Sequence, residues 1–317
     1  MNAHAAAADA GGSRALRWTQ RAIFALALVF IVLYLTRSWS RVGAYSWRVR
    51  PLPLLLSVVA FFAFYILNGL AWWLLLRGFG LRSSPTRAIA TWSKSILARY
   101  VPGNVFMFLG RGIMSYRQGL DIDRVGAAMV YEQALGLCSA LVAAALLLPF
   151  WHYHRAATAW SLLLVPVMVV LMHPKVFARL AGWALRALRR QPLTARLSFG
   201  TVLALLCYYV ATWLLAGVAS WLFATAVTGL GADMLATVAA GYVLAYIAGM
   251  VVFFLPSGLG LREALLAAPL AARLPGGVAF AWALLLRVWQ TLIELAFVGA
   301  AVLLEASVHR GERHDGD

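Results

Sequence analysis

Residues 52–76 form a long apolar run in which Asn68 is the one strongly polar interior residue. About 20 apolar residues in a helix cross the roughly 30 Å hydrocarbon core of a bilayer. A helix satisfies its backbone polar groups internally, so such runs are predicted to be membrane-spanning helices. Further spans are predicted over residues 22–35, 125–150, 158–172, 199–227, 234–255 and 278–304.

The composition agrees with a polytopic membrane protein. Hydrophobic residues make up 63% of the chain and charged residues 12%, against about 45–50% and 25% in soluble proteins. The net charge of +16 is spread among the spans, whereas a nucleic-acid-binding protein concentrates its basic residues in one stripe. Cys138 and Cys207 lie in apolar runs, and no histidine has a ligand partner at metal-site spacing. We therefore predict no nucleic-acid partner, metal or cofactor.

The expected organisation is an all-α protein of about 7–8 transmembrane helices, with residues 19–305 as one membrane domain. Its two halves, 19–173 and 199–305, are joined by the segment 174–198, which contains lysine and arginine but no acid. The positive-inside rule places that segment in the cytoplasm, and its apolar spacing favours a helix on the inner leaflet. Residues 1–18 and 306–317 are predicted to be disordered.

One apolar course is interrupted by the sequence F-L-P-S-G-L-G-L-R-E-A-L-L. Pro256, Gly258 and Gly260 break the helix pattern, and Arg262 and Glu263 follow directly. Unpaired backbone groups and charges are costly in lipid, so a break of this kind persists only where protein or a water-filled cavity surrounds it. We predict a broken or re-entrant helix that lines a binding site.

A second segment, R-Y-V-P-G-N-V-F-M-F-L-G-R, has the same organisation. Arg99 and Tyr100 precede the break at Pro102 and Gly103, and Arg111 closes the following apolar stretch. The segment is too apolar for a loop and too interrupted for a simple span. It is predicted to be a second broken or re-entrant helix, and its five named residues are candidate substrate contacts.

Three acids lie within or beside membrane segments, where a lone carboxylate costs about 3 kcal/mol or more. Each needs a partner or a neutral form. The acids are Glu132, Glu263 and Glu294. The candidate partners are Arg111, Arg262 and Arg287. These residues either form a polar cavity for a charged headgroup, with arginine suited to phosphate, or form ion pairs that only fix helix packing.

The last predicted span carries Arg287, Gln290 and Glu294 at i, i+3 and i+7, so one helical face holds all three. Glu294 follows the second broken segment as Glu132 follows the first, which suggests an internal repeat. Many transporters build a midplane site from repeats with discontinuous helices.

These motifs resemble those of the lysylphosphatidylglycerol synthase transmembrane family. The similarity rests on S-x-x-x-R-Y-V-P-G with a following G-R, on Glu132 followed by Gln133 and Leu135, and on P-S-G-L-G-L-R-E. It extends over roughly residues 20 to 305. This family includes the flippase half of the multiple peptide resistance factor proteins and stand-alone hopanoid-biosynthesis-associated membrane proteins.

The resemblance implies a multi-pass protein of the bacterial inner membrane that moves a lipid, anionic or isoprenoid-linked, between leaflets. Full-length resistance factors continue into a soluble aminoacyl-transferase domain, and nothing like it is found in this sequence, so transport without catalysis is expected. The alternatives are a membrane-embedded lipid-modifying enzyme with Glu263 or Glu132 as general base, and a non-catalytic partner of a lipid-processing complex. The sequence leaves the oligomeric state open, a homo-oligomer included.

Overall fold

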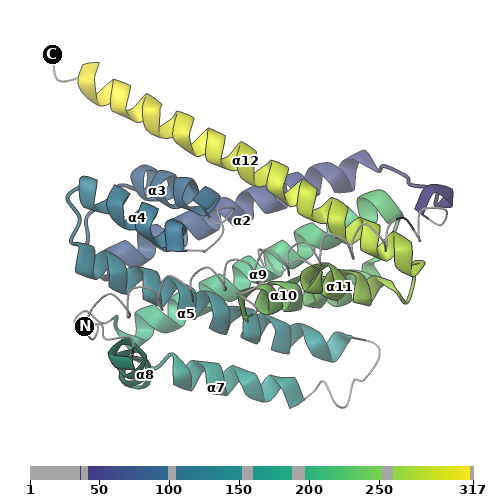
Figure 1. The fold of residues 1–317 in the computed structure, drawn as a ribbon, viewed down its shortest axis with the longest axis horizontal. Coiled ribbons are helices and arrows are strands. Elements are labelled where there is room, and N and C mark those ends of the chain that lie inside the picture. The colour runs from purple at the N-terminus through teal and green to yellow at the C-terminus, as the bar shows by residue number, and fades with distance from the viewer. Residues whose placement is uncertain are drawn as a thin grey trace, which may run out of the picture. The chain divides into compact units, whose positions relative to one another are not determined.

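The computed structural model describes residues 36, 42–98, 105–151, 160–187, 197–251 and 260–314, and all their regular structure is helical (Figure 1). The predicted first span, residues 22–35, lies outside them. The chain divides into two compact units, which do not coincide with the predicted halves. Unit 1 comprises Met1–Ser46 and Ala245–Leu285, and unit 2 comprises Trp47–Leu244 and Leu286–Asp317.

Five helices among the described residues are long and apolar enough to cross a membrane, or six spans if one bent pair is counted. The predicted total of 7–8 and the internal repeat stay predictions. The five helices are α2 (Pro51–Gly78), α5 (Ile122–Leu147, continued by η2, Leu148–Phe150), α9 (Phe199–Thr228), α10 (Leu235–Val251, preceded by η4, Ala232–Met234) and α12 (Gly276–His314).

In unit 2, α2 and α9 run antiparallel along each other. At one end the Arg50 amide donates to the Ala226 carbonyl over 2.9 Å. At the other end the Phe79 ring, just after α2, lies 5.4 Å from the ring of Tyr131 in α5, and Tyr131 lies 4.4 Å from Phe177. The end of α2, the first turns of α5 and the segment carrying Phe177 therefore share one end of the unit.

Two short helices of unit 2 form a hairpin. They are α3 (Pro85–Leu97) and α4 (Val105–Arg117), which lie side by side in Figure 1. Each rises only about 20 Å, less than a bilayer core. Ser84 directly before α3 and Gln118 directly after α4 line the same cavity, so the chain enters and leaves at one end. A re-entrant segment, one of the two arrangements predicted for residues 99–111, stays a prediction.

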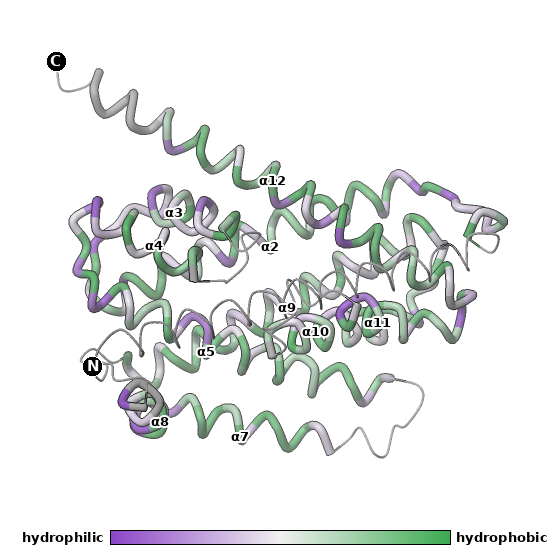
Figure 2. The backbone as a smooth tube through the Cα atoms, in the orientation of Figure 1, coloured by the Kyte–Doolittle hydropathy of each residue, from purple (hydrophilic) through white to green (hydrophobic). Residues whose placement is uncertain are grey.

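The basic segment after the α5 region is bent. η3 (Trp160–Leu163) and α7 (Leu164–Leu171) precede α8 (Pro174–Ala187), and the two helical stretches meet at 81°. Phe177 packs inward on α5, while Trp183 is exposed beside the exposed Arg179 and Arg186. Figure 2 shows the change from the hydrophobic α7 to the mixed α8. This pattern agrees with the predicted helix on a membrane surface.

The C-terminal helix extends further than predicted. The last span was expected to end near Leu304 and residues 306–317 to be disordered, but α12 continues to His314. In unit 2 its outward face is apolar, with Val288, Leu292 and Leu303 exposed as expected for lipid contact. Figure 2 shows hydrophilic positions interrupting this apolar course. In unit 1, α12 is preceded by α11 (Leu261–Ala267) and η6 (Ala268–Leu270).

Helices α9 and α10 lie close together at Gly217. A Cβ atom added there would lie 2.5 Å from the Cβ atom and 3.0 Å from the Cα atom of Ala239. Gly217→Ala is therefore expected to force the helices apart and to lower stability by about 1–3 kcal/mol. At Gly299 no described atom lies within 4 Å of an added Cβ, so Gly299→Ala is expected to raise helix stability by up to about 1 kcal/mol.

Thermal unfolding of the detergent-solubilised variants measures this difference. The melting temperature is expected to fall for Gly217→Ala and to stay level or rise for Gly299→Ala. A melting temperature for Gly217→Ala equal to that of the parent protein would contradict the close α9 and α10 contact.

Candidate functional site

A buried ion pair joins the α3 and α4 hairpin to a membrane-length helix. The Arg111 guanidinium of α4 donates through Nη1 to Oε2 of Glu132 in α5. Arg111 is 1% exposed and Glu132 8%. The prediction that Glu132 finds an arginine partner is thereby confirmed, with Arg111 as that partner. Glu132 lies ten residues after the first residue of α5, which is about 15 Å along a helix long enough to cross a bilayer.

Three further side chains complete this cluster. Trp92 of α3 donates its indole N–H to Oε1 of Glu132 over 2.7 Å. Arg111 Nε donates to Ser95 Oγ over 2.9 Å, and its Cζ lies 4.7 Å from the centroid of the Trp72 ring. Both carboxylate oxygens of Glu132 therefore have donors. The guanidinium is held by a hydrogen bond, a charge and an aromatic face, so its position is fixed although its charge is buried.

A second buried acid lies next to this cluster. Glu294 of α12 is fully buried and accepts through Oε2 from the Tyr65 hydroxyl of α2 over 2.9 Å. Tyr65 stacks on Phe297 with centroids 5.5 Å apart, and Phe297 meets the Trp92 ring edge-on at 6.3 Å. The deep acids predicted at equivalent positions, Glu132 and Glu294, are thus linked through aromatic side chains in the interior of unit 2.

The polar residues predicted on one face of the last span contact different helices. Gln290 Nε2 donates to the Tyr242 hydroxyl of α10 over 2.7 Å, whereas Glu294 meets Tyr65 of α2. Arg287 is partly buried. The three side chains share one side of α12, as predicted, but Gln290 and Glu294 contact separate helices.

In unit 1, Glu263 has a structural role that the sequence analysis did not predict. It is fully buried, and its Oε2 accepts from the Gly260 backbone N–H over 2.6 Å, which caps α11. Gly260 has φ +89°, a conformation that side-chain-bearing residues rarely adopt. The side chain of Arg262 passes beside Gly249 of α10. A shared cavity for Arg262 and Glu263, and a pairing of Glu263 with Arg111 or Arg287, stay predictions.

Several predicted site residues cannot be placed. They lie outside the described residues, at the two Pro/Gly breaks: Arg99, Tyr100, Pro102, Gly103, Pro256 and Gly258.

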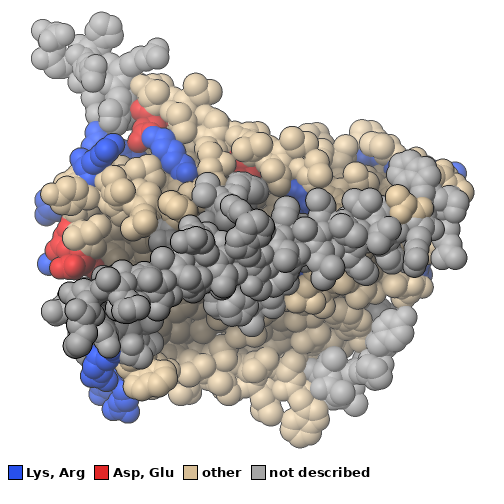
Figure 3. All heavy atoms as spheres, viewed as in Figure 1, with Lys and Arg blue, Asp and Glu red and all other residues tan. Residues whose placement is uncertain are grey.

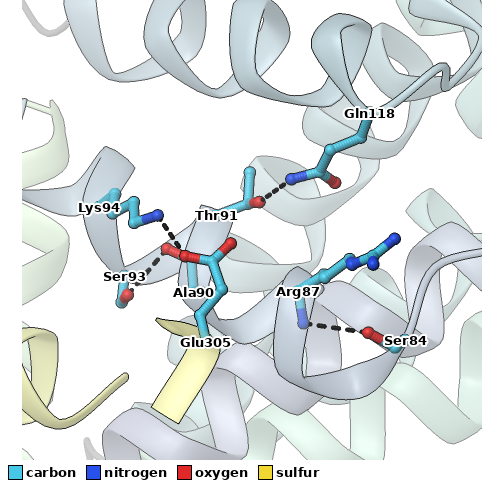
Figure 4. Close-up of polar contacts among 8 residues, drawn as sticks. All are labelled: Ser84, Arg87, Ala90, Thr91, Ser93, Lys94, Gln118 and Glu305. Carbon is cyan, nitrogen blue, oxygen red and sulfur yellow. Dashed lines mark hydrogen bonds and ion pairs between the residues drawn. The ribbon is translucent and has the colours of Figure 1, made fainter. Parts of the chain in front are cut away.

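The hairpin is also tied to α12 by a second ion pair. Lys94 of α3 donates to Glu305, as Figure 4 shows together with the hydrogen bond from Gln118 to Thr91. Glu305 follows the predicted end of the last span at residue 304 and lies within α12. Within the part of the chain that the structure describes, no group of three or more His, Cys, Asp or Glu side chains could hold a metal ion.

Comparison with known proteins gives one family. Residues 22–297 match the model of the family described as the lysylphosphatidylglycerol synthase TM region. A search of curated proteins found no match. The match covers α2 to α11 and residues 276–297 of α12, which include Glu294 and Phe297.

Proposed function

The chain belongs to the lysylphosphatidylglycerol synthase transmembrane family, and from this and the buried cluster we propose that it moves a polar-headgroup lipid between the leaflets of a bacterial inner membrane. The observation that carries the proposal is the Arg111 and Glu132 pair, buried between the α3 and α4 hairpin and α5, a helix long enough to span a membrane. A buried ion pair is a poor source of stability, since replacement by apolar residues is often neutral or stabilising. The presence of this pair is better explained by a role in lipid transport than by a role in helix packing.

The pair supplies what a phosphate-bearing headgroup needs. Arginine presents a planar fork that matches phosphate oxygens, whereas lysine offers only a point charge. Without lipid, Glu132 neutralises Arg111 inside the apolar interior. When a headgroup reaches the cluster, its phosphate binds the guanidinium beside the carboxylate, since arginine has five N–H donors, and Glu132 keeps its contacts with Arg111 and Trp92.

Access to the cluster requires motion, because Arg111 is only 1% exposed in this conformation. The α3 and α4 hairpin is the element suited to move. Both of its helices are too short to span, and the exposed end of α3 is joined to α12 by the ion pair of Lys94 with Glu305. Displacement of the hairpin would expose Arg111 to a lipid headgroup without separating α2 from α9.

Reconstituted liposomes test the proposal. Fluorescent phosphatidylglycerol, phosphatidylcholine and an isoprenoid phosphate are placed in both leaflets, and a membrane-impermeant quencher reports how fast inner-leaflet lipid reaches the outside. We expect faster exchange with the protein than without it for at least one phosphate-bearing lipid. Exchange no faster than in protein-free liposomes for every lipid would reject transport, and a change in lipid mass would support a membrane-embedded enzyme instead.

A further inference from the structure

Two buried donor groups near Arg111 have no acceptor within the part of the chain that the structure describes. They are the indole N–H of Trp72 in α2 and the hydroxyl of Ser115 in α4, and neither side chain is more than 1% exposed. A buried donor normally finds an acceptor, because leaving it unpaired costs free energy. Two such groups near the buried ion pair are therefore candidate contacts for a ligand.

The other buried tryptophans described in unit 2 do have acceptors. Trp92 donates to Glu132 over 2.7 Å, and Trp213 donates to Ser139 Oγ over 3.1 Å. Trp72 instead has the Arg111 guanidinium over its ring, with Cζ 4.7 Å from the ring centroid. An indole N–H lies in the plane of its ring, so the N–H of Trp72 does not point at this cation and is available to an acceptor.

Buried serines in these helices usually donate to a carbonyl oxygen of their own helix. Ser93 and Ser220 do so over 2.9 Å and 2.8 Å. Ser115 does not, although it lies within α4. It follows Arg111 by four residues, so the two side chains lie on the same face of α4, and each is 1% exposed.

Arg111 itself has donors that the ion pair does not use. A guanidinium carries five N–H groups. Nε donates to Ser95 and Nη1 to Glu132, while Nη2 makes no hydrogen bond within the described residues. Three unpaired donors, two from α4 and one from α2, thus surround one buried guanidinium.

We propose that these donors form the phosphate-binding part of the lipid site, with Trp72 and Ser115 as its specificity-determining residues. This inference rests on the proposed function. The phosphate oxygens accept from Arg111 Nη2, from the Trp72 indole N–H and from the Ser115 hydroxyl. The contact between Arg111 and the Trp72 ring holds α4 and α2 together at this point, so the donors are in place before lipid arrives.

The charges of the cluster select the class of phosphate. Glu132 already balances Arg111, and Trp72 and Ser115 donate hydrogen bonds without adding charge. Each negative charge on the ligand therefore adds to the net charge of a buried site, which is costly. A phosphodiester carries one negative charge, whereas a phosphomonoester carries about 1.5 to 2 at pH 7. The site favours a phosphodiester lipid, such as phosphatidylglycerol, over a monoester such as phosphatidic acid.

Surface charge is a different source of phosphate binding. Figure 3 shows lysine and arginine gathered mainly at the end of the visible face where α3, α4 and α8 lie. Such charges attract the more highly charged lipid, phosphatidic acid, more strongly. Their attraction is also unchanged when a buried neutral donor is removed. Both the order of the two lipids and the effect of neutral variants therefore distinguish the buried site from the surface.

Binding without transport tests the proposal. The detergent-solubilised full chain is titrated calorimetrically with dioctanoyl-phosphatidylglycerol and dioctanoyl-phosphatidic acid. We expect phosphatidylglycerol to bind the parent protein more tightly. Ser115→Ala and Trp72→Phe should each weaken its binding about tenfold, because each loses a hydrogen bond to a charged acceptor. Arg117→Gln removes an exposed charge of α4 and should change the affinity less than about twofold.

The melting temperature without lipid separates binding from a structural role. Ser115→Ala removes no hydrogen bond of the lipid-free protein, so its melting temperature should stay level or rise. Ser220→Ala is the matched buried control. Ser220 follows Ala219, which accepts from Ser57 near the opposite end of α2 from Trp72. This variant should leave the lipid affinity within about twofold.

Unchanged phosphatidylglycerol affinity in either Ser115→Ala or Trp72→Phe would overturn the proposal, and so would an equal loss in Ser220→Ala. A lower melting temperature for lipid-free Ser115→Ala would assign that hydroxyl to structure instead. Phosphatidic acid binding as tightly as phosphatidylglycerol would overturn the phosphodiester assignment, and a parent protein that binds neither lipid would overturn the site. None of these outcomes depends on whether the protein transports lipid, which the liposome assay tests separately.

Discussion

Arg111→Met and Glu132→Met are each expected to lower the free energy of unfolding by about 3–5 kcal/mol and to abolish lipid transport. Each change leaves one charge buried without its partner, at a position where Arg111 is 1% and Glu132 8% exposed. Among the described residues, the removed carboxylate would leave Arg111 with Ser95 and the Trp72 ring, and the removed guanidinium would leave Glu132 with the Trp92 indole. Thermal unfolding in detergent measures the stability of each variant.

The double variant Arg111→Met/Glu132→Met separates charge balance from function. Removing both charges leaves no uncompensated ion, so its melting temperature should rise well above that of either single variant. Arg117→Met is the matched control, since Arg117 is exposed at the end of the same helix and should tolerate the change. Additive destabilisation in the double variant would mean that the two side chains do not depend on each other.

Tyr65→Phe is expected to lower the free energy of unfolding by about 1–3 kcal/mol, the cost of removing a hydroxyl donor from a buried charged acceptor. The ring can keep its stacking on Phe297, so the change isolates the 2.9 Å hydrogen bond to Glu294. Transport should fall as well, because Phe297 contacts both the Tyr65 ring and the Trp92 ring of the Arg111 and Glu132 cluster.

Tyr116→Phe provides the comparison for this effect. Tyr116 is 68% exposed on α4, so loss of its hydroxyl should change the free energy of unfolding by less than about 0.5 kcal/mol. A Tyr65→Phe protein as stable as Tyr116→Phe would show that the hydroxyl does not support Glu294.

The spanning helices could be predicted because length and apolarity alone decide them. The run at 52–76 became α2, Pro51–Gly78, and the run at 199–227 became α9, Phe199–Thr228. The pairing of Glu132 with an arginine could also be anticipated, since a lone carboxylate at that depth is too costly to persist.

The remainder of the cluster depends on which helix faces pack together. Trp72, Trp92 and Tyr65 are three of 13 tryptophans and 11 tyrosines, and nothing local distinguishes them from exposed aromatics such as Trp160. Only the packing of their helices, α2 and α3, against α4, α5 and α12 brings them to Arg111, Glu132 and Glu294. Ser95 was noted within a motif, but its contact with Arg111 depends on how the hairpin closes.

Glu263 illustrates the opposite case, in which a local signal was present. An acid three residues after Gly260, at the start of an apolar stretch, is the pattern of a helix cap, and the structure gives Glu263 that contact. The prediction that Glu263 contacts a ligand rested on the cost of burying its charge. The Gly260 contact provides one partner for this carboxylate without any substrate.

The central claim is that the Arg111 and Glu132 pair handles lipid and does not merely hold helices together. Lipid exchange by Arg111→Met/Glu132→Met in liposomes tests it most directly, with the parent protein and Arg117→Met measured in parallel. We predict a folded double variant that exchanges lipid no faster than protein-free liposomes, while Arg117→Met retains the parent rate. Exchange at the parent rate by the double variant would contradict the claim and assign the pair to packing.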